Sequence, residues 1–405
     1  MIRRDLYLDK LSNFIDKPLI KVITGIRRSG KSMVLKLLQE ELRRRHVSEE
    51  QILYLNFESF EFSDIDTSDK LYRYVKRRIS SNKRYYILLD EIQEIKSWEK
   101  AVNSFSVDFN VDIYITGSNS RLLSSELATY LAGRYVEIHL YTLSFSESLL
   151  FKKVRTSEEQ FNHRGEFENF LRTGGFPVLH IAEYTPDSAY KVIFDIYSSA
   201  ILRDTIQRHH IRDVELLERV VRFVLDNTGN KFSAKNVADY FKSQKRRIDL
   251  NTVYNYLTAL QSAFIIDRIP RYDIKGKEIL KTYEKYFAGD HAMIYAVMGY
   301  KDRMISGVLE NIVMLELKRR GYRVFTGKLD EKEIDFIAET NGNRIYIQVA
   351  YKMTGKSTID REFKPLLEIR DHHPKYVVTM DDIWRDNIEG IKHIHIADFL
   401  LMKEY

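Results

Sequence analysis

The chain has 405 residues, 44% of them hydrophobic and 30% charged, a composition typical of a chain that folds throughout. Its length predicts two or three domains, and its lack of cysteine excludes a disulfide framework and any cysteine-held zinc or iron–sulfur site. The formal net charge of +6 and the pI near 9.0 favour an anionic partner without identifying one.

The N-terminal stretch MIRRDLYLDKLSNF lacks an apolar core of signal-peptide length. Nowhere do about 18 uncharged apolar residues follow one another, so we expect no membrane span. A cysteine-free chain also fits a reducing compartment, and the cytoplasm is the expected location.

A phosphate-binding loop is predicted near the N-terminus. The run PLIKVITG reads as a buried parallel strand, and apolar residues at helical spacing follow the glycine-rich segment. This order of strand, loop and helix suits a loop whose backbone amides face phosphates, with Lys31 reaching the β- and γ-phosphates and the Ser32 hydroxyl on Mg²⁺. The predicted nucleotide-binding residues are Gly25, Ile26, Arg27, Arg28, Ser29, Gly30, Lys31, Ser32 and Met33.

Two acidic residues end the next strongly apolar run, KRYYILLDEIQEI. Asp90 would lie at the tip of a strand, where open α/β sheets bind ligands, and would organise Mg²⁺. Glu91 would then polarise the attacking water. The alternative for the pair is an ordinary strand-to-helix turn with a capping acid.

Further polar residues follow a third strand, VDIYITGSNSRLL. Ser118 or Asn119 could hold the γ-phosphate or the water, the role called sensor 1. Arg134, directly after a glycine, could act as an arginine finger across a subunit interface, which implies a homo-oligomer during turnover. A surface salt bridge is the competing interpretation of Arg134.

Together these motifs resemble a family of prokaryotic AAA-superfamily ATPases. The segments ITGIRRSGKS, ILLDEIQEI, ITGSNSRLLSSELATYLAGR and LSFSE carry the resemblance, and LRTGGFPVLH and ILRDTI, which contains Arg203 and Asp204, also fit it. The resemblance implies ATP as the nucleotide and the roles already given to Lys31, Ser32, Asp90, Glu91, Ser118 and Arg134. It also implies an AAA core, a winged-helix segment and a C-terminal domain of restriction-endonuclease-like fold.

The middle of the chain is consistent with a winged helix-turn-helix. Ser233 is a good N-cap for a first helix, a basic turn leads to a second helix, and a hairpin is expected around DIKGKE. If the second helix enters a major groove, Asn251, Thr252 and Asn255 could reach base edges. The predicted phosphate contacts are Lys242, Lys245, Arg246, Arg247, Lys275 and Lys277. Winged helices also dock proteins, so a protein partner remains the alternative to DNA.

The C-terminal segment contains a partial nuclease pattern. An Asn-Gly pair at 341–342 between apolar runs predicts a hairpin. Glu310, Asp335 and Gln348 match places of a restriction-endonuclease-like site, but Ala350 fills the lysine position. Lys352 would share a strand face with Gln348 and lie about 7 Å too far along. Since Gln348 is neutral, the sequence favours a retained fold over an active metal-dependent nuclease.

The predicted fold class is α/β, with a P-loop NTPase core of the AAA type built on a parallel sheet. The predicted divisions are an ATPase core (1–150), a helical region (151–228), the winged helix-turn-helix (229–290) and an α/β nuclease-like domain (291–405). The predicted function is Mg²⁺-dependent ATP hydrolysis coupled to DNA. The alternatives are a signalling or scaffold ATPase and an ATP-gated nuclease.

Overall fold

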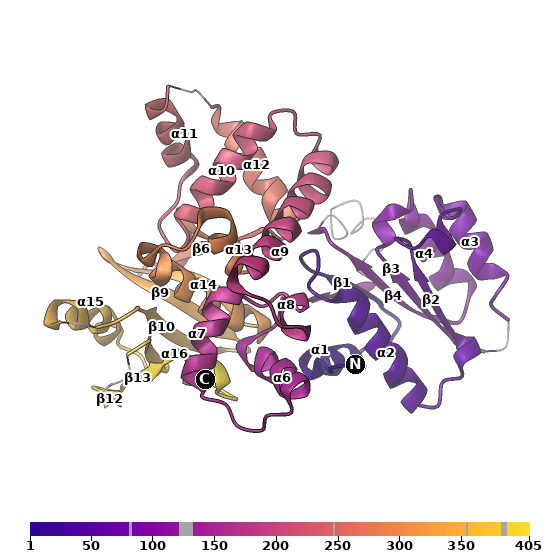
Figure 1. Cartoon of the computed structure of the whole chain (residues 1–405), viewed down its shortest axis with the longest axis horizontal. Helices are drawn as coiled ribbons and strands as arrows, with labels where there is room; N and C mark the ends of the chain where they lie inside the picture. Colours follow the sequence, from indigo (N-terminus) through magenta and orange to yellow (C-terminus); the bar gives the residue numbers. More distant parts are fainter. Residues whose placement is uncertain (81–82, 121–132, 246–247, 354, 382–386) are drawn as a thin grey trace. The chain divides into compact units, whose positions relative to one another are not determined.

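A computed structural model describes the chain except for residues 81–82, 121–132, 246–247, 354 and 382–386 (Figure 1). The chain divides into two compact units, Met1–Tyr141 with Ser262–Phe264, and Thr142–Gln261 with Ile265–Tyr405. Each unit has a sheet of its own. Within the described ranges, no helix combines the length and apolar character needed to cross a membrane.

The first unit is built on a five-stranded sheet of order β2-β3-β4-β1-β5 in which every pairing is parallel. Its strands are β1 (Ile20–Thr24), β2 (Ile52–Asn56), β3 (Tyr85–Asp90), β4 (Val111–Gly117) and β5 (Tyr135–His139), and its helices are α1 (Asp5–Ser12), α2 (Lys31–Arg44), α3 (Ser68–Lys76) and α4 (Trp98–Asp108). The predicted P-loop NTPase fold with a parallel sheet is therefore confirmed.

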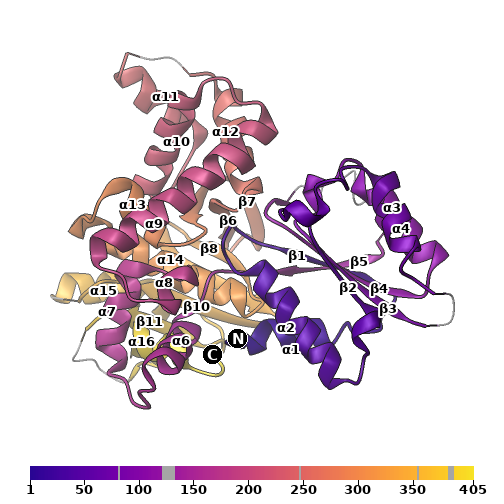
Figure 2. The same ribbon diagram turned by 45° about the vertical axis from the view of Figure 1, so that its right-hand side comes forward.

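Helices cover both faces of this sheet. Figure 2 shows α1 and α2 on one side of the strands and α3 and α4 on the other. Because side chains alternate along a strand, Ile87 and Leu89 pack toward α3 and α4, whereas Tyr86 and Leu88 pack toward α1 and α2. The same alternation places Asp90 on the α2 side of the sheet.

A buried ion pair joins two central strands. Lys21 on β1 donates to Asp112 on β4, and both side chains are fully buried. Asp112 also accepts hydrogen bonds from the Asp16 amide at 2.8 Å and the Tyr114 hydroxyl at 2.9 Å. Both oxygens of the carboxylate therefore accept hydrogen bonds, as a buried charge requires.

The second unit combines helices with a mixed sheet of order β12-β13-β11-β10-β9-β8-β6-β7. Its helices are α6 (Phe145–Thr156), α7 (His163–Thr173), α8 (Val178–Ile181), α9 (Pro186–Ser199), α10 (Val214–Asp226), α11 (Ala234–Ser243), α12 (Leu250–Ser262), α13 (Ala292–Met298), α14 (Ile305–Arg319), α15 (Lys356–Leu367) and α16 (Ile396–Leu401). Its strands are β6 (Ile266–Asp273), β7 (Glu278–Ala288), β8 (Arg323–Leu329), β9 (Lys332–Thr340), β10 (Asn343–Val349), β11 (Lys375–Thr379), β12 (Asn387–Ile388) and β13 (Ile391–His395). A π-helical segment, Ala200–Gln207, follows α9 and contains the ILRDTI motif.

The hairpin predicted as a wing is part of this sheet. Strand β6 pairs antiparallel with β7 and parallel with β8, with Arg271 opposite Thr326. Backbone hydrogen bonding therefore joins the segments on either side of residue 290, where we expected a boundary. The structure divides into two compact units, which do not test the fourfold division of the chain, and that division stays a prediction.

Two local sequence signals have the geometry that they predict. Asn341 and Gly342 have φ values of 47° and 84° between β9 and β10, as a tight turn of this hairpin type requires. The Ser233 side chain accepts from the Asn236 amide at the start of α11. Both elements are therefore determined by local chemistry.

The TGGFP motif forms a clamp inside the second unit. Gly174 has φ +70°, and a Cβ there would lie 2.3 Å from the Asp290 carboxylate. The Gly175 amide donates to the same carboxylate at 2.9 Å, and the Gly175 carbonyl accepts from the Leu143 amide at 2.6 Å. The glycines thus allow the segment that follows the first unit to be held against the Asp290 turn.

Candidate nucleotide site

The predicted phosphate loop lies between β1 and α2. Gly25 and Gly30 have φ values of 150° and 101°, and Arg28 between them has φ 68°. A Cβ at Gly25 would lie 2.2 Å from the carbonyl oxygen of Leu140, so this position requires glycine. The loop then enters α2 with Gly30 as N-cap, and the first amides of this helix are free to face an anion.

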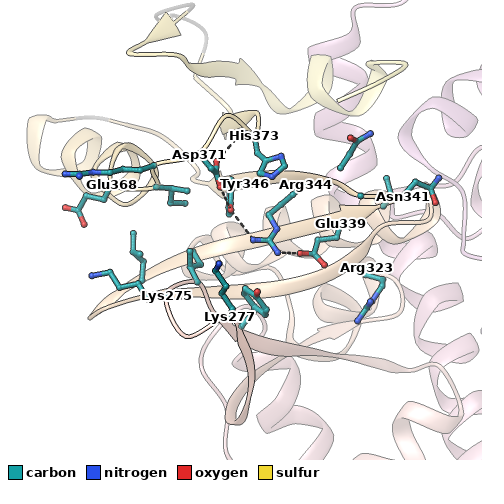
Figure 3. Close-up of a pocket in the computed structure, with 18 of the residues that line it drawn as sticks. Lys275, Lys277, Arg323, Glu339, Asn341, Arg344, Tyr346, Glu368, Asp371 and His373 are labelled. Carbon is teal, nitrogen blue, oxygen red and sulfur yellow. Dashed lines mark hydrogen bonds and ion pairs between the residues drawn. The ribbon is translucent and has the colours of Figure 1, made fainter.

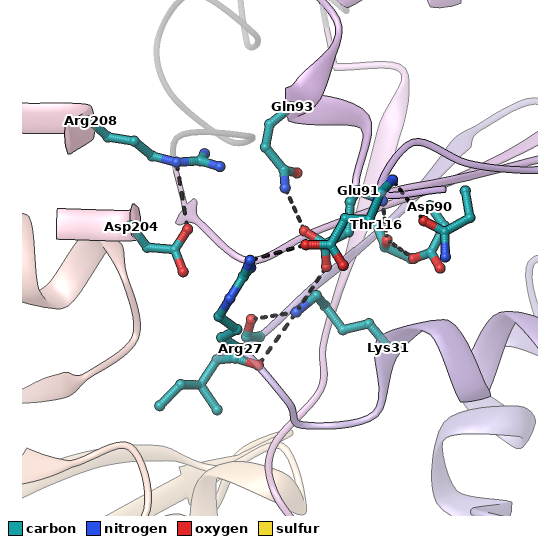
Figure 4. A network of polar contacts seen from close by, with 12 residues as sticks. Arg27, Lys31, Asp90, Glu91, Gln93, Thr116, Asp204 and Arg208 are labelled. Atoms are coloured by element: carbon teal, nitrogen blue, oxygen red, sulfur yellow. Dashed lines mark hydrogen bonds and ion pairs between the residues drawn. The ribbon is translucent and has the colours of Figure 1, made fainter. Parts of the chain in front are cut away.

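Lys31 places its ammonium group at the centre of the loop (Figure 4). The residue is 4% exposed, and its Nζ lies 3.2 Å from the Gly25 carbonyl, 3.4 Å from the Ile26 carbonyl and 3.5 Å from Glu91 Oε1. A buried ammonium among carbonyl oxygens and one carboxylate is suited to binding phosphate oxygens.

Asp90 and Glu91 lie at the carboxyl end of β3, as predicted. Asp90 is fully buried and accepts from the Tyr54 hydroxyl at 2.9 Å and the Thr116 hydroxyl at 2.5 Å. The Glu91 amide donates to Thr116 Oγ1 at 2.9 Å. Thr116 therefore fixes both acids from the end of β4, the strand that separates β3 from the loop-bearing β1.

Glu91 is held in its ionised form. Its φ of 55° lies in the left-handed region, and its carboxylate accepts a short hydrogen bond from the Gln93 amide group. Burial alone would raise the pKa of Glu91, but the charges of Lys31 and Arg27 and the Gln93 hydrogen bond outweigh burial and lower that pKa. A carboxylate that stays charged can orient and polarise a water molecule.

The residues present fit a magnesium nucleotide. The candidate magnesium ligands are the Ser32 hydroxyl, in the first turn of α2, and the Asp90 carboxylate, at the end of β3. Both are oxygen donors, the ligands that Mg²⁺ prefers. Among the described residues no group of three or more histidine, aspartate or glutamate side chains forms a metal cluster. The ion would therefore depend on phosphate oxygens and water for its other ligands.

The remaining predicted nucleotide-site residues lie next to β4 and β5 and on α2. Ser118 and Asn119 directly follow β4 and are fully buried. Arg134 is exposed before β5, and its carbonyl accepts from the Ile20 amide at 2.8 Å. Met33 is 44% exposed on α2. The roles assigned to these side chains stay predictions.

Three supporting residues were missed by the sequence analysis. Arg4 is 3% exposed and donates to the Ser29 carbonyl and to the Tyr141 carbonyl, both at 3.0 Å. Tyr54 and Thr116 hold Asp90. Thr116 could have been found from its place at the tip of a predicted strand, whereas Arg4 lies in a segment without any motif.

The C-terminal acidic residues meet a lysine that the sequence analysis did not consider. Lys285 on β7 is almost fully buried, and its Nζ lies 2.8 Å from Glu333, 3.0 Å from Glu310 and 3.4 Å from Asp335. These side chains line a cavity of about 900 Å³. Burial opposes a charge on Lys285, but the three carboxylates raise its pKa, so it stays protonated.

Lys352 lies beyond the end of β10 at Val349. Backbone hydrogen bonds to the β11 side continue past this end, from the Ala350 amide to the Val378 carbonyl and from the Met380 amide to the Tyr351 carbonyl, both at 3.0 Å. Lys352 also lines the cavity that holds Glu310, Asp335 and Gln348, and its role stays a prediction. The Lys352 ammonium is 5.3 Å from the centre of the Tyr351 ring, and the residue is exposed. Gln348 does join Asp335: its side-chain oxygen accepts from the Asp335 amide at 2.7 Å, and its amide group donates to Glu362 at 3.0 Å.

Most of the predicted DNA-contacting residues are exposed. Asn251 and Asn255 are exposed on α12, Thr252 is half-buried, and Lys242 and Lys245 are exposed at and after the end of α11. Lys275 and Lys277 lie in the turn between β6 and β7, where Lys275 pairs with Asp330 at 2.6 Å. Arg246 and Arg247 lie outside the described residues.

The fold and the phosphate loop place the first unit in the class of P-loop NTPase domains. Residues 17–149 match the model of an AAA domain. Residues 164–303 and 306–398 match two domains of unknown function, DUF8612 and DUF4143. In fold, the chain is similar to the Walker-type ATPase of Pyrococcus abyssi, with a TM-score of 0.51, 15% identity and coverage of 73% of this chain and 96% of that one.

Two curated relatives match nearly the whole chain. An uncharacterized protein of Haemophilus influenzae is 39% identical over 402 residues, 99% of each chain. An uncharacterized protein of Methanocaldococcus jannaschii is 30% identical over 417 residues, 98% of this chain and 88% of that one. The chain belongs to the family of these proteins, and in this chain the AAA domain precedes the DUF8612 and DUF4143 domains.

Proposed function

We propose that the protein binds ATP with Mg²⁺, hydrolyses its terminal phosphoanhydride bond, and couples hydrolysis to contact with DNA. The convergence of Lys31, Asp90 and Glu91 at one edge of the parallel sheet carries the proposal. A buried cation for phosphate, a carboxylate for the metal and a second, charged carboxylate for water are the parts that water attack on a γ-phosphate requires.

Each residue would have a separate task. Lys31 and the first amides of α2 would hold the phosphates and neutralise charge that develops on the transferring group. Ser32 and Asp90 would hold Mg²⁺, which supplies further charge neutralisation when it is bound. Glu91 would orient the attacking water, and Ser118 or Asn119 would contact the γ-phosphate or that water.

The exposed position of Arg134 supports a role between subunits. Its guanidinium follows Gly133, whose φ is +74°, on a turn before β5. An arginine presented in this way could reach the nucleotide of a second copy of the chain. We therefore propose a homo-oligomer during turnover.

The DNA assignment is supported by exposed polar and basic side chains on α11, α12 and the β6–β7 turn. Asn251 and Asn255 are on the exposed side of the first two turns of α12, and exposed lysines flank this helix in the chain. The competing function is the docking of a protein partner on the same helices.

The carboxylate cluster around Lys285 supports a structural role better than a nuclease role. The lysine ammonium already contacts Glu310 and Asp335, the two carboxylates of the partial nuclease pattern. Removal of Lys285 would take away the cation that Glu310 and Asp335 share, whereas Glu333 would keep Lys231 at 3.2 Å. The lysine therefore stabilises the packing of β7 against α14 and β9. We propose that this domain is retained for its fold, with metal-dependent cleavage as the less favoured alternative.

The proposal is tested by steady-state ATP hydrolysis with and without single-stranded, duplex and branched DNA. Glu91→Gln should lower hydrolysis by about 100-fold or more, because the charge that orients the water is removed. ATP affinity should be unchanged or higher, since the variant leaves Lys31 free for phosphate. The control is Glu94→Gln on the same short turn, which should hydrolyse ATP like the natural protein.

The outcomes separate the parts of the proposal. Full turnover in Glu91→Gln would remove Glu91 from its assigned role. Hydrolysis that no DNA stimulates, with no DNA binding at low salt, would favour the docked-protein function.

A further inference from the structure

A second cavity, of about 1050 Å³, lies in the second unit, and we call it the hairpin groove (Figure 3). It is lined by the β6–β7 turn with Lys275 and Lys277, by the β9–β10 turn, and by the segment 368–373 that follows α15. Three connections that are distant in sequence therefore surround one concave surface.

The hairpin groove has an excess of positive charge. Each of its acidic residues is paired with a cation: Asp330 with Lys275, Glu339 with Arg344, Glu368 with Lys332, and Asp371 with Lys375. Lys277, Arg323 and Arg370 also line it, are exposed, and form no ion pair with a described residue. These three cations are available to an anionic ligand.

The groove also offers flat surfaces. The Arg344 guanidinium lies 5.3 Å from the centre of the Tyr272 ring, and the His373 and Tyr346 rings are 6.4 Å apart. A Cβ on Gly342 would meet no atom within 4 Å, so the turn backbone can be approached closely. Aromatic and guanidinium planes stack on nucleobases, and the neighbouring Asn341 amide can hydrogen-bond to base edges.

We propose that the hairpin groove binds a single strand of nucleic acid, with phosphates at Lys277, Arg323 and Arg370 and a base on the Tyr272–Arg344 surface. Cations together with stacking planes fit a nucleic-acid strand better than an acidic peptide, which offers charge without bases. A single strand is favoured over a duplex because paired bases keep their faces stacked on each other. The inference rests on the proposed contact with DNA and extends it beyond α12.

The test is binding of a fluorescent oligo-dT at about 100 mM salt, followed by anisotropy without nucleotide. The double variant Arg323→Ala, Arg370→Ala leaves the β6–β7 turn and α12 intact. Loss of two phosphate contacts should weaken single-strand binding roughly 10- to 25-fold and lower the log–log salt slope by about 1.4. The control, Lys153→Ala with Lys191→Ala, removes two exposed lysines of α6 and α9 and should bind as the natural protein does.

A second variant tests stacking. Tyr272→Leu keeps an apolar side chain where Tyr272 packs on the neighbouring core, so the domain should still fold. It should reduce quenching of a 2-aminopurine base in the bound strand.

Several results would overturn the inference: no single-strand binding by the natural protein, unchanged affinity in the double variant, or an equal loss in the double variant and the lysine control. An equal loss for duplex and single strand would make the surface a duplex contact and overturn the strand assignment. These measurements contain no ATP. Failure of the proposed hydrolysis would instead appear in the Glu91→Gln comparison.

Discussion

At the scale of single residues, Arg4 provides the clearest supporting contact of the nucleotide site. Its guanidinium joins the Ser29 carbonyl of the phosphate loop to the Tyr141 carbonyl and lies 4.5 Å from the centre of the Tyr7 ring. Arg4→Ala should leave both carbonyls without this donor and loosen the loop. We expect ATP affinity to fall by about tenfold, from the loss of roughly 1.5 kcal/mol of charged hydrogen bonding.

The neighbouring Arg3 is a matched control, because it is half-buried outside the loop and pairs with Asp5 at 3.0 Å on the surface. Arg3→Ala should keep the affinity of the natural protein. Titration with a fluorescent ATP analogue measures both variants. Equal affinity in Arg4→Ala and Arg3→Ala would show that the loop does not depend on Arg4.

The residues that the sequence revealed are those whose chemistry is local. Lys31 and Asp90 could be predicted because a loop and a strand end are readable within a few positions. Lys285 could not, because the acids that surround it lie on α14 and β9, and only the tertiary fold brings them to β7. The same holds for Arg4.

At the scale of elements, the free energy that holds β7 against α14 and β9 should depend on pH. Burial raises the pKa of Glu310 to about 8, against the opposing effect of Lys285. Between about pH 4.5 and 8, the folded protein therefore holds a proton that the unfolded chain has released. This contribution to the free energy of unfolding is fully present below the pKa of Glu310 in the unfolded chain, and it is lost as the pH rises through 8.

Glu310→Gln should remove this dependence, because the amide mimics the protonated acid. Urea unfolding of the second unit, followed by circular dichroism from pH 5 to 8.5, should show a shallower decline in the variant. The difference in slope should reach at most about 1.4 kcal/mol per pH unit, the value for one proton. Glu278→Gln, an exposed change on the same strand, should keep the natural slope. Parallel pH profiles for Glu310→Gln and the natural protein would contradict the assignment.

Element types were easier to predict from sequence than element ends. The hairpin around DIKGKE is present, but β6 runs to Asp273 and β7 to Ala288, whereas the sequence predicted strands over 264–269 and 278–283. Partners that are distant in sequence, such as β8, extend the ladder. Strand β10 ends at Val349, before Lys352, so the side-chain alternation projected to Lys352 stays a prediction.

At the scale of the whole molecule, the division into two compact units predicts two unfolding transitions. Every residue assigned to ATP or Mg²⁺ lies in the first unit, so a ligand should stabilise that unit directly. A nonhydrolysable ATP analogue at 100 times its Kd adds about 2.7 kcal/mol. For a unit of this size, that corresponds to a rise on the order of 10 °C in its melting temperature.

Trp98 makes the transition of the first unit visible, since it is 6% exposed in the core beside α3 and α4. In a Trp384→Phe background, tryptophan fluorescence reports Trp98 alone, while calorimetry records both transitions. The analogue with Mg²⁺ should raise the fluorescence midpoint, and Lys31→Ala should abolish the rise. A second transition that moves by the same amount would mean that the units unfold together. A second transition that stays in place would mean that ATP binding alone does not stabilise the unit that carries the proposed DNA surfaces, so that coupling would require hydrolysis or assembly.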